Sequence, residues 1–180
     1  WCAANRYWLS APPNADLLRI TVKCAGEHSA AMLRVPRGTR VIAEGPFGAF
    51  TAARRRSTRV LFIAGGVGIT PLRAMFESVE AAPGEVTMLY RARAEDDLLF
   101  RAELERIASE RGARLYYLLG ASASGGDALL SSEQLRQLVP RLDEHDVYLC
   151  GPPGMTALAR RSLRQAGVAG NHIHEESFAL

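Results

Sequence analysis

The stretch VLFIAGGVGITP at residues 60–71 constrains the fold of this chain more than any other part of the sequence. Four apolar residues run directly into Gly65, Gly66 and Gly68. A short apolar run that ends at glycines is typical of a strand buried inside a parallel sheet. The sequence therefore predicts that the chain is built around this strand and the turn that follows it.

The residues after the glycines predict a helix. Thr70 carries a hydroxyl that can cap free N–H groups, and Pro71 has the fixed φ that suits a first turn. Apolar residues then recur at helical spacing, at Leu72, Met75, Phe76 and Val79. Glycines in such a turn allow close backbone approach to a ligand, and a helix N-terminus favours phosphate. The spacing differs from the Rossmann GxGxxG, and glycine-rich turns also serve packing alone.

Strands and helices alternate from residue 59 to the end of the chain. The expected strands are 60–63, 86–90, 115–119 and 147–150, and the expected helices lie near 71–81, 97–111, 132–139 and 154–166. Residues 120–127 predict a flexible loop. This alternation predicts an α/β fold with a doubly wound parallel sheet, in which ligands bind at the carboxyl ends of the strands.

The first part of the chain has a different pattern. Apolar and polar residues alternate over 18–22, residues 41–44 are another strand candidate, and a short helical turn is expected near 29–33. Two or three strands do not form a stable closed sheet alone. We therefore expect 1–57 to be part of a small antiparallel β-barrel domain and 58–180 to be a nucleotide-binding domain.

Charge and cysteine content narrow the functional classes. The 180 residues carry a net charge of +3, but residues 1–57 hold nine Lys and Arg against three Asp and Glu. Such a basic part suits a phosphate-bearing ligand, an anionic membrane face or an acidic partner, and equally a solvated arginine-rich surface.

The three cysteines lie far apart, which argues against an iron–sulfur cluster or structural zinc within this segment. His172 and His174 would share a face of a strand, but two ligands make a poor metal site.

Two further strand ends carry candidate binding residues. Cys150 ends a predicted strand, two prolines stiffen the turn at 151–154, and Met155 opens the next helix. A stiff turn of this kind can support a planar ring, and it can also be a simple connection. Arg91 and Arg93 follow another strand, where arginine favours the 2′-phosphate of NADP over the hydroxyl of NAD.

The motifs IAGGVGITP, YRAR and YLCGPPGM, in this order, resemble the NAD(P) domain of the ferredoxin–NADP reductase superfamily. The pattern is most similar to the ferric reductase and NADPH oxidase branch, and GPFG at 45–48 resembles the closing strand of that family's flavin barrel. The resemblance implies that NADPH passes a hydride to FAD. It also implies that single electrons then reach a metal centre in a haem, ferric iron or iron–sulfur partner.

The resemblance assigns roles to residues of this chain. It implies a pyrophosphate cradle at Gly65, Gly66, Gly68, Thr70 and Pro71, and a 2′-phosphate site at Arg91 and Arg93. It implies a nicotinamide site at Cys150, Gly151 and Pro152, with Met155 as a further cofactor contact. The implied catalytic residues are Cys150, near the path of the hydride, and Glu176 and Phe178, beside the flavin ring. Flavin contacts are implied for Tyr7, Trp8, Ser10, Thr21, Val22, Lys23 and Ser29. Asn5 stands where the family has Arg or His, and Trp8 where it has a small hydroxyl residue.

Three hypotheses follow from these patterns. The first is a flavoprotein reductase that belongs to a larger protein, located in the cytoplasm at the inner face of a membrane, with no nucleic-acid partner. The second is a nucleotide-binding or sensing module whose altered flavin site, with Trp8 at its centre, has lost redox activity. The third is a dioxygenase reductase whose iron–sulfur domain lies outside this segment. The flavin spectrum of the purified protein separates the first hypothesis from the second.

Overall fold

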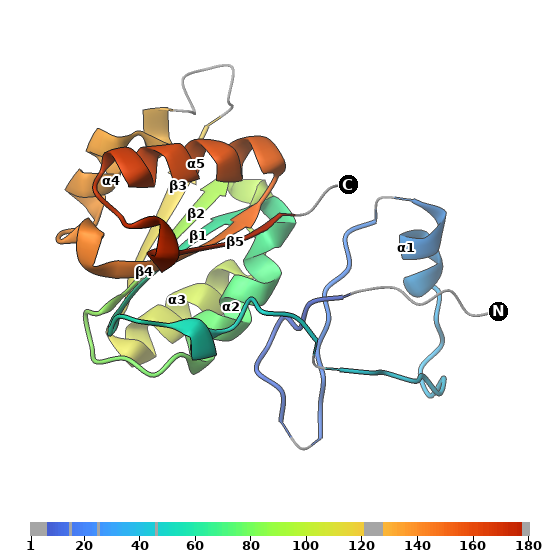
Figure 1. Cartoon of the computed structure of the whole chain (residues 1–180). Coiled ribbons are helices and arrows are strands. Elements are labelled where there is room, and N and C mark those ends of the chain that lie inside the picture. The colour runs from blue at the N-terminus through green and yellow to red at the C-terminus, as the bar shows by residue number, and fades with distance from the viewer. Residues whose placement is uncertain (1–6, 15, 25, 46, 121–127, 178–180) are drawn as a thin grey trace.

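A five-stranded parallel sheet forms the centre of the molecule, with the strand order β3-β2-β1-β4-β5 (Figure 1). The structure is a computed structural model that describes residues 7–14, 16–24, 26–45, 47–120 and 128–177. The strands are β1 Arg59–Gly65, β2 Val86–Ala92, β3 Arg114–Leu119, β4 His145–Gly151 and β5 Ile173–Ser177. The chain winds outward from β1 in one direction and then in the other, so the predicted doubly wound α/β fold is confirmed.

Helices cover both faces of the sheet. In Figure 1, α2 Ile69–Ser78 and α3 Arg101–Arg111 lie on one face, and α4 Ser132–Leu138 and α5 Pro153–Gln165 lie on the other. Alternate residues of β1 enter the two cores: Phe62 packs in the core under α2, and Ile63 packs in the core under α5. Burial on both faces explains why β1 is a continuous apolar run and not an alternating one.

Two element boundaries differ from the sequence-based expectation. The strand β5 was not predicted, because IHEES contains a single aliphatic residue and the strand pairs only with β4. The helix α3 begins at Arg101 and not near residue 97, because Glu95–Asp97 forms a separate 3-10 turn. Phe100, which precedes the helix, has a φ of +61° and interrupts any continuous helix at that point.

The described part of residues 7–57 holds one short α-helix, α1 Glu27–Met32, one 3-10 turn, Ala52–Arg54, and one antiparallel bridge, between Leu9 and Ile20. The strand expected at 41–44 is wrong, because no neighbouring strand pairs with it, and the Ile42 side chain is 95% exposed. The turn expected near 29–33 corresponds to α1. Asn5, Pro46, Phe178 and the loop at 121–127 lie outside the described residues.

An aromatic cluster joins the N-terminal part to the sheet. Phe50 is buried in the core under α2 and packs edge-to-face against Trp8 and Tyr148, with ring centroids 5.9 and 5.6 Å away. The Tyr148 hydroxyl donates a hydrogen bond of 3.2 Å to the Thr51 carbonyl. Tyr148 therefore anchors the connecting segment from the middle of β4.

A buried carboxylate at the start of β4 holds the same connection further along the chain. Asp146 is fully buried and accepts hydrogen bonds of 2.5 Å from the backbone N–H groups of Arg56 and Ser57. The ring nitrogens of His172 and His174 approach the other carboxylate oxygen, at 3.4 and 3.1 Å. The two histidines lie close together and both face Asp146. This carboxylate therefore connects the segment that enters β1 with the segment that enters β5.

Candidate nucleotide-binding site

The turn after β1 places its glycines in different surroundings. Gly66–Gly68 forms a 3-10 turn that continues directly into α2. Gly66 has a φ of +53°, and a Cβ added there would meet no atom within 4 Å. A Cβ at Gly68 would lie 2.2 Å from the carbonyl oxygen of Cys150. Gly66 therefore presents backbone to open space, whereas Gly68 allows α2 to begin directly against the end of β4.

The carboxyl ends of β1 and β4 are packed together by a methionine from α5. A Cβ at Gly65 would lie 2.3 Å from Met155 Sδ, and a Cβ at Gly151 would lie 2.6 Å from Met155 Cε. The same Gly151 Cβ would also lie 3.2 Å from Gly65 Cα. These two glycines therefore make room for Met155, which fills the space between the two turns. The open backbone of Gly66, at a helix N-terminus, fits the phosphates of a dinucleotide.

Thr70 and Pro71 lie within the first turn of α2 and do not cap it. The residue at the cap position is Gly68, and no side chain accepts a cap hydrogen bond there. The Thr70 hydroxyl donates to the carbonyl of Val67 at 2.9 Å. The predicted capping role is wrong, because the 3-10 turn starts the helical path earlier and brings a carbonyl within reach of the hydroxyl.

The nicotinamide-side candidates come together at the ends of β4 and β5. Cys150 is fully buried, and it lies opposite Glu176 in the register of these two strands. Burial raises the pKa of the Cys150 thiol, and the negative charge of Glu176 raises it further. The thiol is therefore neutral at physiological pH, and it lies inside the core under α2. Pro152 stands at the N-cap of α5 and is exposed.

The two arginines at the end of β2 have different environments. Arg91 is buried, and its guanidinium donates to the backbone carbonyls of Ala92 and Leu118. Arg93 is exposed. Arg91 is thus engaged with the sheet itself, and Arg93 is the arginine that remains accessible to an anion at this strand end.

Tyr90 was not identified from the sequence, yet it supports the glycine turn directly. Its ring is fully buried, and its hydroxyl donates to the Gly66 carbonyl at 3.2 Å. The same oxygen accepts a 3.2 Å hydrogen bond from the backbone N–H of Leu99. Burial raises the pKa of Tyr90, so the hydroxyl keeps its proton. A tyrosine in an otherwise apolar strand was the available signal, because a buried hydroxyl needs a partner.

The flavin-side candidates are divided between accessible and engaged groups. Tyr7 is exposed, and Trp8 lies against Phe50. Ser10 is fully buried; its hydroxyl donates to the Arg19 carbonyl and accepts a 2.8 Å hydrogen bond from the Thr21 hydroxyl. Val22 is half-buried, Lys23 is exposed, and Ser29 Oγ contacts the Gly26 backbone in α1. An aromatic face is therefore available for a flavin ring, whereas the Ser10 hydroxyl is already paired.

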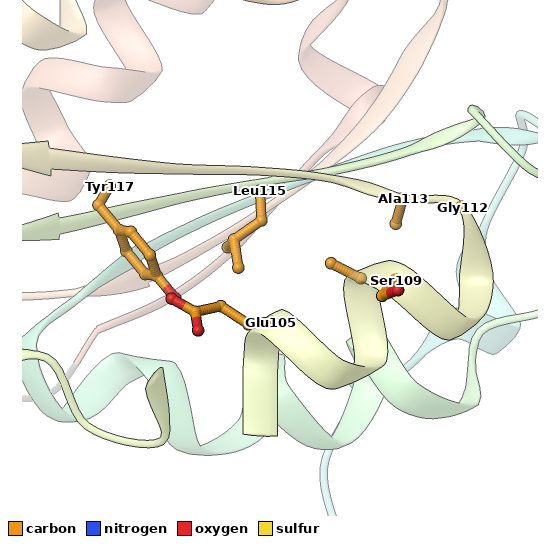
Figure 2. A pocket seen from close by; sticks show the side chains of 7 residues that line it. Glu105, Ser109, Gly112, Ala113, Leu115 and Tyr117 are labelled. Carbon is orange, nitrogen blue, oxygen red and sulfur yellow. The ribbon is translucent and has the colours of Figure 1, made fainter. Parts of the chain in front are cut away.

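A shallow depression lies away from the strand ends, between the last turns of α3 and strand β3 (Figure 2). Figure 2 shows the Tyr117 ring reaching toward the Glu105 carboxylate across this depression. Burial and the Glu105 charge raise the pKa of Tyr117 to about 12. None of the candidate site residues lines it; the lining residues are Glu105, Ala108, Ser109, Gly112, Ala113, Leu115 and Tyr117.

Two kinds of feature are absent from the described residues. No helix among them has the length and apolar character needed to cross a membrane. In the same part of the chain, no group of three or more His, Cys, Asp or Glu side chains is arranged to hold a metal ion.

The fold and the glycine turns define a nucleotide-binding α/β domain of the oxidoreductase type. Residues 62–161 match the family described as the oxidoreductase NAD-binding domain. The chain is 33% identical to Ferredoxin–NADP reductase B of Sorangium cellulosum over 180 residues, covering 92% of this chain and 72% of that protein. This chain belongs to the ferredoxin–NADP reductase-like superfamily.

Other relatives extend the comparison. The ferredoxin reductase component of 3-ketosteroid-9-alpha-monooxygenase from Mycolicibacterium smegmatis is 32% identical over 97% of this chain and 50% of its own length. The chain spans 33% and 41% of the length of two further curated reductases. A ferredoxin NADP+ reductase from Neisseria gonorrhoeae with bound FAD and NADP has the same fold, with a TM-score of 0.76 and 18% identity over 95% of this chain and 78% of that one. The relatives are oxidoreductases, and the Neisseria structure holds both cofactors.

Proposed function

We propose that this chain is the reductase part of an NADPH-dependent flavoprotein that delivers electrons to a metal-centre acceptor. Bound FAD would take a hydride from NADPH and release electrons one at a time. The observation that carries the proposal is the glycine turn Gly66–Gly68 at the carboxyl end of β1, beside the end of β4. Its backbone faces open space at Gly66 and lies at the N-terminus of α2.

Different residues of the chain would bind different parts of NADPH. The backbone at Gly66 and the start of α2 would hold the pyrophosphate of NADPH. Arg93 would pair with the 2′-phosphate, since Arg91 is bonded to backbone carbonyls. The nicotinamide would lie at the exposed turn that begins at Pro152, with the buried, neutral thiol of Cys150 just before this turn and Glu176 beside it on β5.

The flavin would contact the segment around Tyr7 and the basic residues near α1. The exposed Tyr7 ring supports this role. Trp8 packs edge-to-face against Phe50, and Ser10 is hydrogen-bonded to Thr21 and Arg19, so these residues would shape the site without donating to the flavin. The proposed division of the chain into a partial flavin domain at 1–57 and a nucleotide domain at 58–180 follows the start of β1.

The alternative is a module that binds NADPH without a working flavin. The Ser10 hydroxyl favours it, because this group donates to the Arg19 carbonyl and accepts from the Thr21 hydroxyl, and is therefore unavailable to a flavin. The acceptor in the main proposal is a haem, ferric iron or iron–sulfur protein, supported by the relative from Mycolicibacterium, which is a reductase component of a monooxygenase. A cytoplasmic position at the inner face of a membrane, reached through other parts of a longer protein, remains part of the proposal.

An anaerobic titration of the purified protein tests the proposal. Oxidised flavin absorbance that bleaches on addition of NADPH, and less completely with equal NADH, is the expected result. A protein that binds NADPH, measured by quenching of its fluorescence, but carries no flavin after reconstitution with excess FAD contradicts the reductase function and supports the binding module.

A further inference from the structure

A buried arginine on α2 reaches from the nucleotide-binding half to the N-terminal part of the chain. The Arg73 side chain is only 4% exposed. Its guanidinium donates to the backbone carbonyl of Ser10 at 3.1 Å, to Glu77 at 2.7 Å and to Glu103 at 2.8 Å. One side chain thus bonds to α2, α3 and the N-terminal segment at the same time.

A second arginine completes the network from the N-terminal side. Arg19 pairs with Glu103 at 2.9 Å and donates to the same Ser10 carbonyl at 2.7 Å. Its guanidinium also lies over the Phe100 ring, 5.2 Å from the centroid. Hydrogen bonds from Arg19 hold the pKa of Glu103 below its ordinary value of 4.5, so the carboxylate stays ionised. Two cations therefore converge on one carbonyl and one carboxylate.

The network is built more tightly than a surface ion pair. An exposed pair contributes little, since water screens it and both side chains must be ordered. Here Ser10 is fully buried and the Arg73 side chain nearly so, whereas Arg19, Glu77 and Glu103 are 31%, 34% and 36% exposed. The planar fork of arginine fixes the direction of each hydrogen bond. The directional hydrogen bonds of Arg73 therefore fix the position of the Ser10 backbone relative to α2, and charge attraction alone would not.

This arrangement links two parts of the proposed reaction site. The helix that carries Arg73 begins at the glycine turn, where NADPH is proposed to bind. Ser10 follows Tyr7 and Trp8, the residues proposed to lie against the flavin, by two to three positions. A shift of the Ser10 carbonyl would displace the flavin-side segment relative to the nucleotide. Misplacement of reacting groups by about 1 Å can slow a reaction on the order of 100-fold.

We propose that Arg73 is a positioning residue that, with Glu103 and Arg19, sets the distance between the nicotinamide and flavin sites. This inference rests on the proposed reductase function. It assigns to α2 a second task besides phosphate binding, which is to hold the N-terminal segment in register with the nucleotide.

The first arm of the test uses the protein without flavin. Hydrogen exchange is measured at the backbone N–H of Ser10, which is bonded to the Arg19 carbonyl at 2.7 Å. Arg73→Met and Glu103→Gln are expected to raise exchange there by about tenfold or more, because the segment loses its anchor. Arg136→Met is the matched control: Arg136 joins α4 to α5 by donating to the Gln165 carbonyl on the other face of the sheet. Unchanged exchange in both variants would overturn the inference.

The second arm uses the flavin-loaded protein in rapid mixing with NADPH. Arg73→Met is expected to slow flavin reduction by about 10- to 100-fold and to weaken the nicotinamide–flavin charge-transfer band, with the Kd for NADPH changed by less than about threefold. Arg73→Lys keeps the charge but not the fork, and an intermediate rate is expected. Normal reduction in Arg73→Met, despite faster exchange, would overturn the positioning role while leaving the reductase function in place. Wild-type protein that takes up no flavin would overturn both.

Discussion

At the scale of single residues, two glycines of one turn have different surroundings and therefore different structural roles. Gly66 faces open space with a positive φ, whereas Gly68 touches the backbone of Cys150. Identical substitutions at these two positions should therefore have different effects: at Gly66 mainly on ligand binding, and at Gly68 mainly on stability.

Gly66→Ala should leave the protein folded and weaken NADPH binding. The new Cβ meets no protein atom, and the left-handed backbone costs about 1 kcal/mol of stability. The Cβ would occupy space next to the bound phosphates, so the Kd for NADPH should rise by about tenfold. Fluorescence titration measures the affinity, and urea unfolding measures the stability.

Gly68→Ala provides the contrast. A Cβ at this position would lie 2.2 Å from the Cys150 carbonyl oxygen, which is backbone and cannot move freely. The free energy of unfolding should fall by about 3 kcal/mol. A Gly68→Ala protein as stable as the wild type, or a Gly66→Ala protein with normal affinity, would show that these two environments have been misassigned.

Tyr90→Phe removes one oxygen from beneath the glycine turn. The Gly66 carbonyl and the Leu99 N–H both lose a partner, so the free energy of unfolding should fall by about 1–2 kcal/mol. The ring itself still fills the core, so the fold should persist. Circular dichroism during urea unfolding measures the loss, and Tyr116→Phe is the control on the neighbouring strand β3.

Arg93→Ala should reduce the preference for NADPH over NADH. If Arg93 pairs with the 2′-phosphate, NADPH affinity should fall by about tenfold to 100-fold while NADH affinity stays nearly unchanged. NADH in the same variant is the internal control. An equal loss for both nucleotides would place the 2′-phosphate elsewhere.

These residues show how far the sequence could specify the site. The glycines, Cys150 and the arginines were found because each follows an apolar strand. Their separate tasks could not be predicted, because contacts such as Gly68 with Cys150 join residues about 80 positions apart. Tyr90 was missed because a hydroxyl partner is visible only when the turn and its neighbours are folded.

At the scale of elements, the interior strands were more predictable than the edges. β2 and β4 are buried throughout and β1 is buried after Arg59, and their apolar runs reveal them. The edge strand β5 carries His174, Glu175 and Glu176, so its sequence lacks the apolar pattern by which strands are predicted. The strand expected at 41–44 failed for the opposite reason: a suitable pattern without a partner does not form a sheet.

The start of β4 should make stability depend on pH. His145 is buried, and its Nδ1 lies 2.9 Å from the Arg141 carbonyl. Burial lowers the pKa of His145 from its ordinary value of 6.5. The unfolded chain then binds the proton first, so this contribution to stability is complete above pH 6.5 and is lost as the pH falls toward the folded-state pKa.

The variant His145→Gln isolates this effect. Urea unfolding at pH 7.5 and 5.5 should show a larger loss of stability for the wild type than for the variant. An equal loss in both proteins would show that His145 does not cause the pH dependence.

At the scale of the whole molecule, the two parts of the chain are joined at separate places on one sheet. Arg73 holds Ser10 near α2, Tyr148 holds Thr51, and Asp146 holds the backbone entering β1. The sequence predicted a boundary near residue 57 but not these connections, because each joins residues at least 63 positions apart.

Asp146→Asn should loosen the junction. The charged carboxylate accepts from two backbone N–H groups, and its replacement by an amide should lower the free energy of unfolding by about 2 kcal/mol. Limited trypsin digestion should then cut faster at the arginines of 54–56. Asp143→Asn, at an exposed position before β4, is the control. Unchanged stability and cleavage would mean that the junction is held without Asp146.

The Asp146 contact also has a consequence for synthesis of the protein. Arg56 leaves the ribosome 90 residues before Asp146, and at about 5–20 residues per second the delay is several seconds. During that interval the connecting segment has no carboxylate to bind, and β1 has no β4 on its second edge. The N-terminal part therefore cannot form its contacts with Asp146 until the later strands have been synthesised. A nascent chain arrested ahead of β4 should expose this part of the molecule to chaperones and proteases.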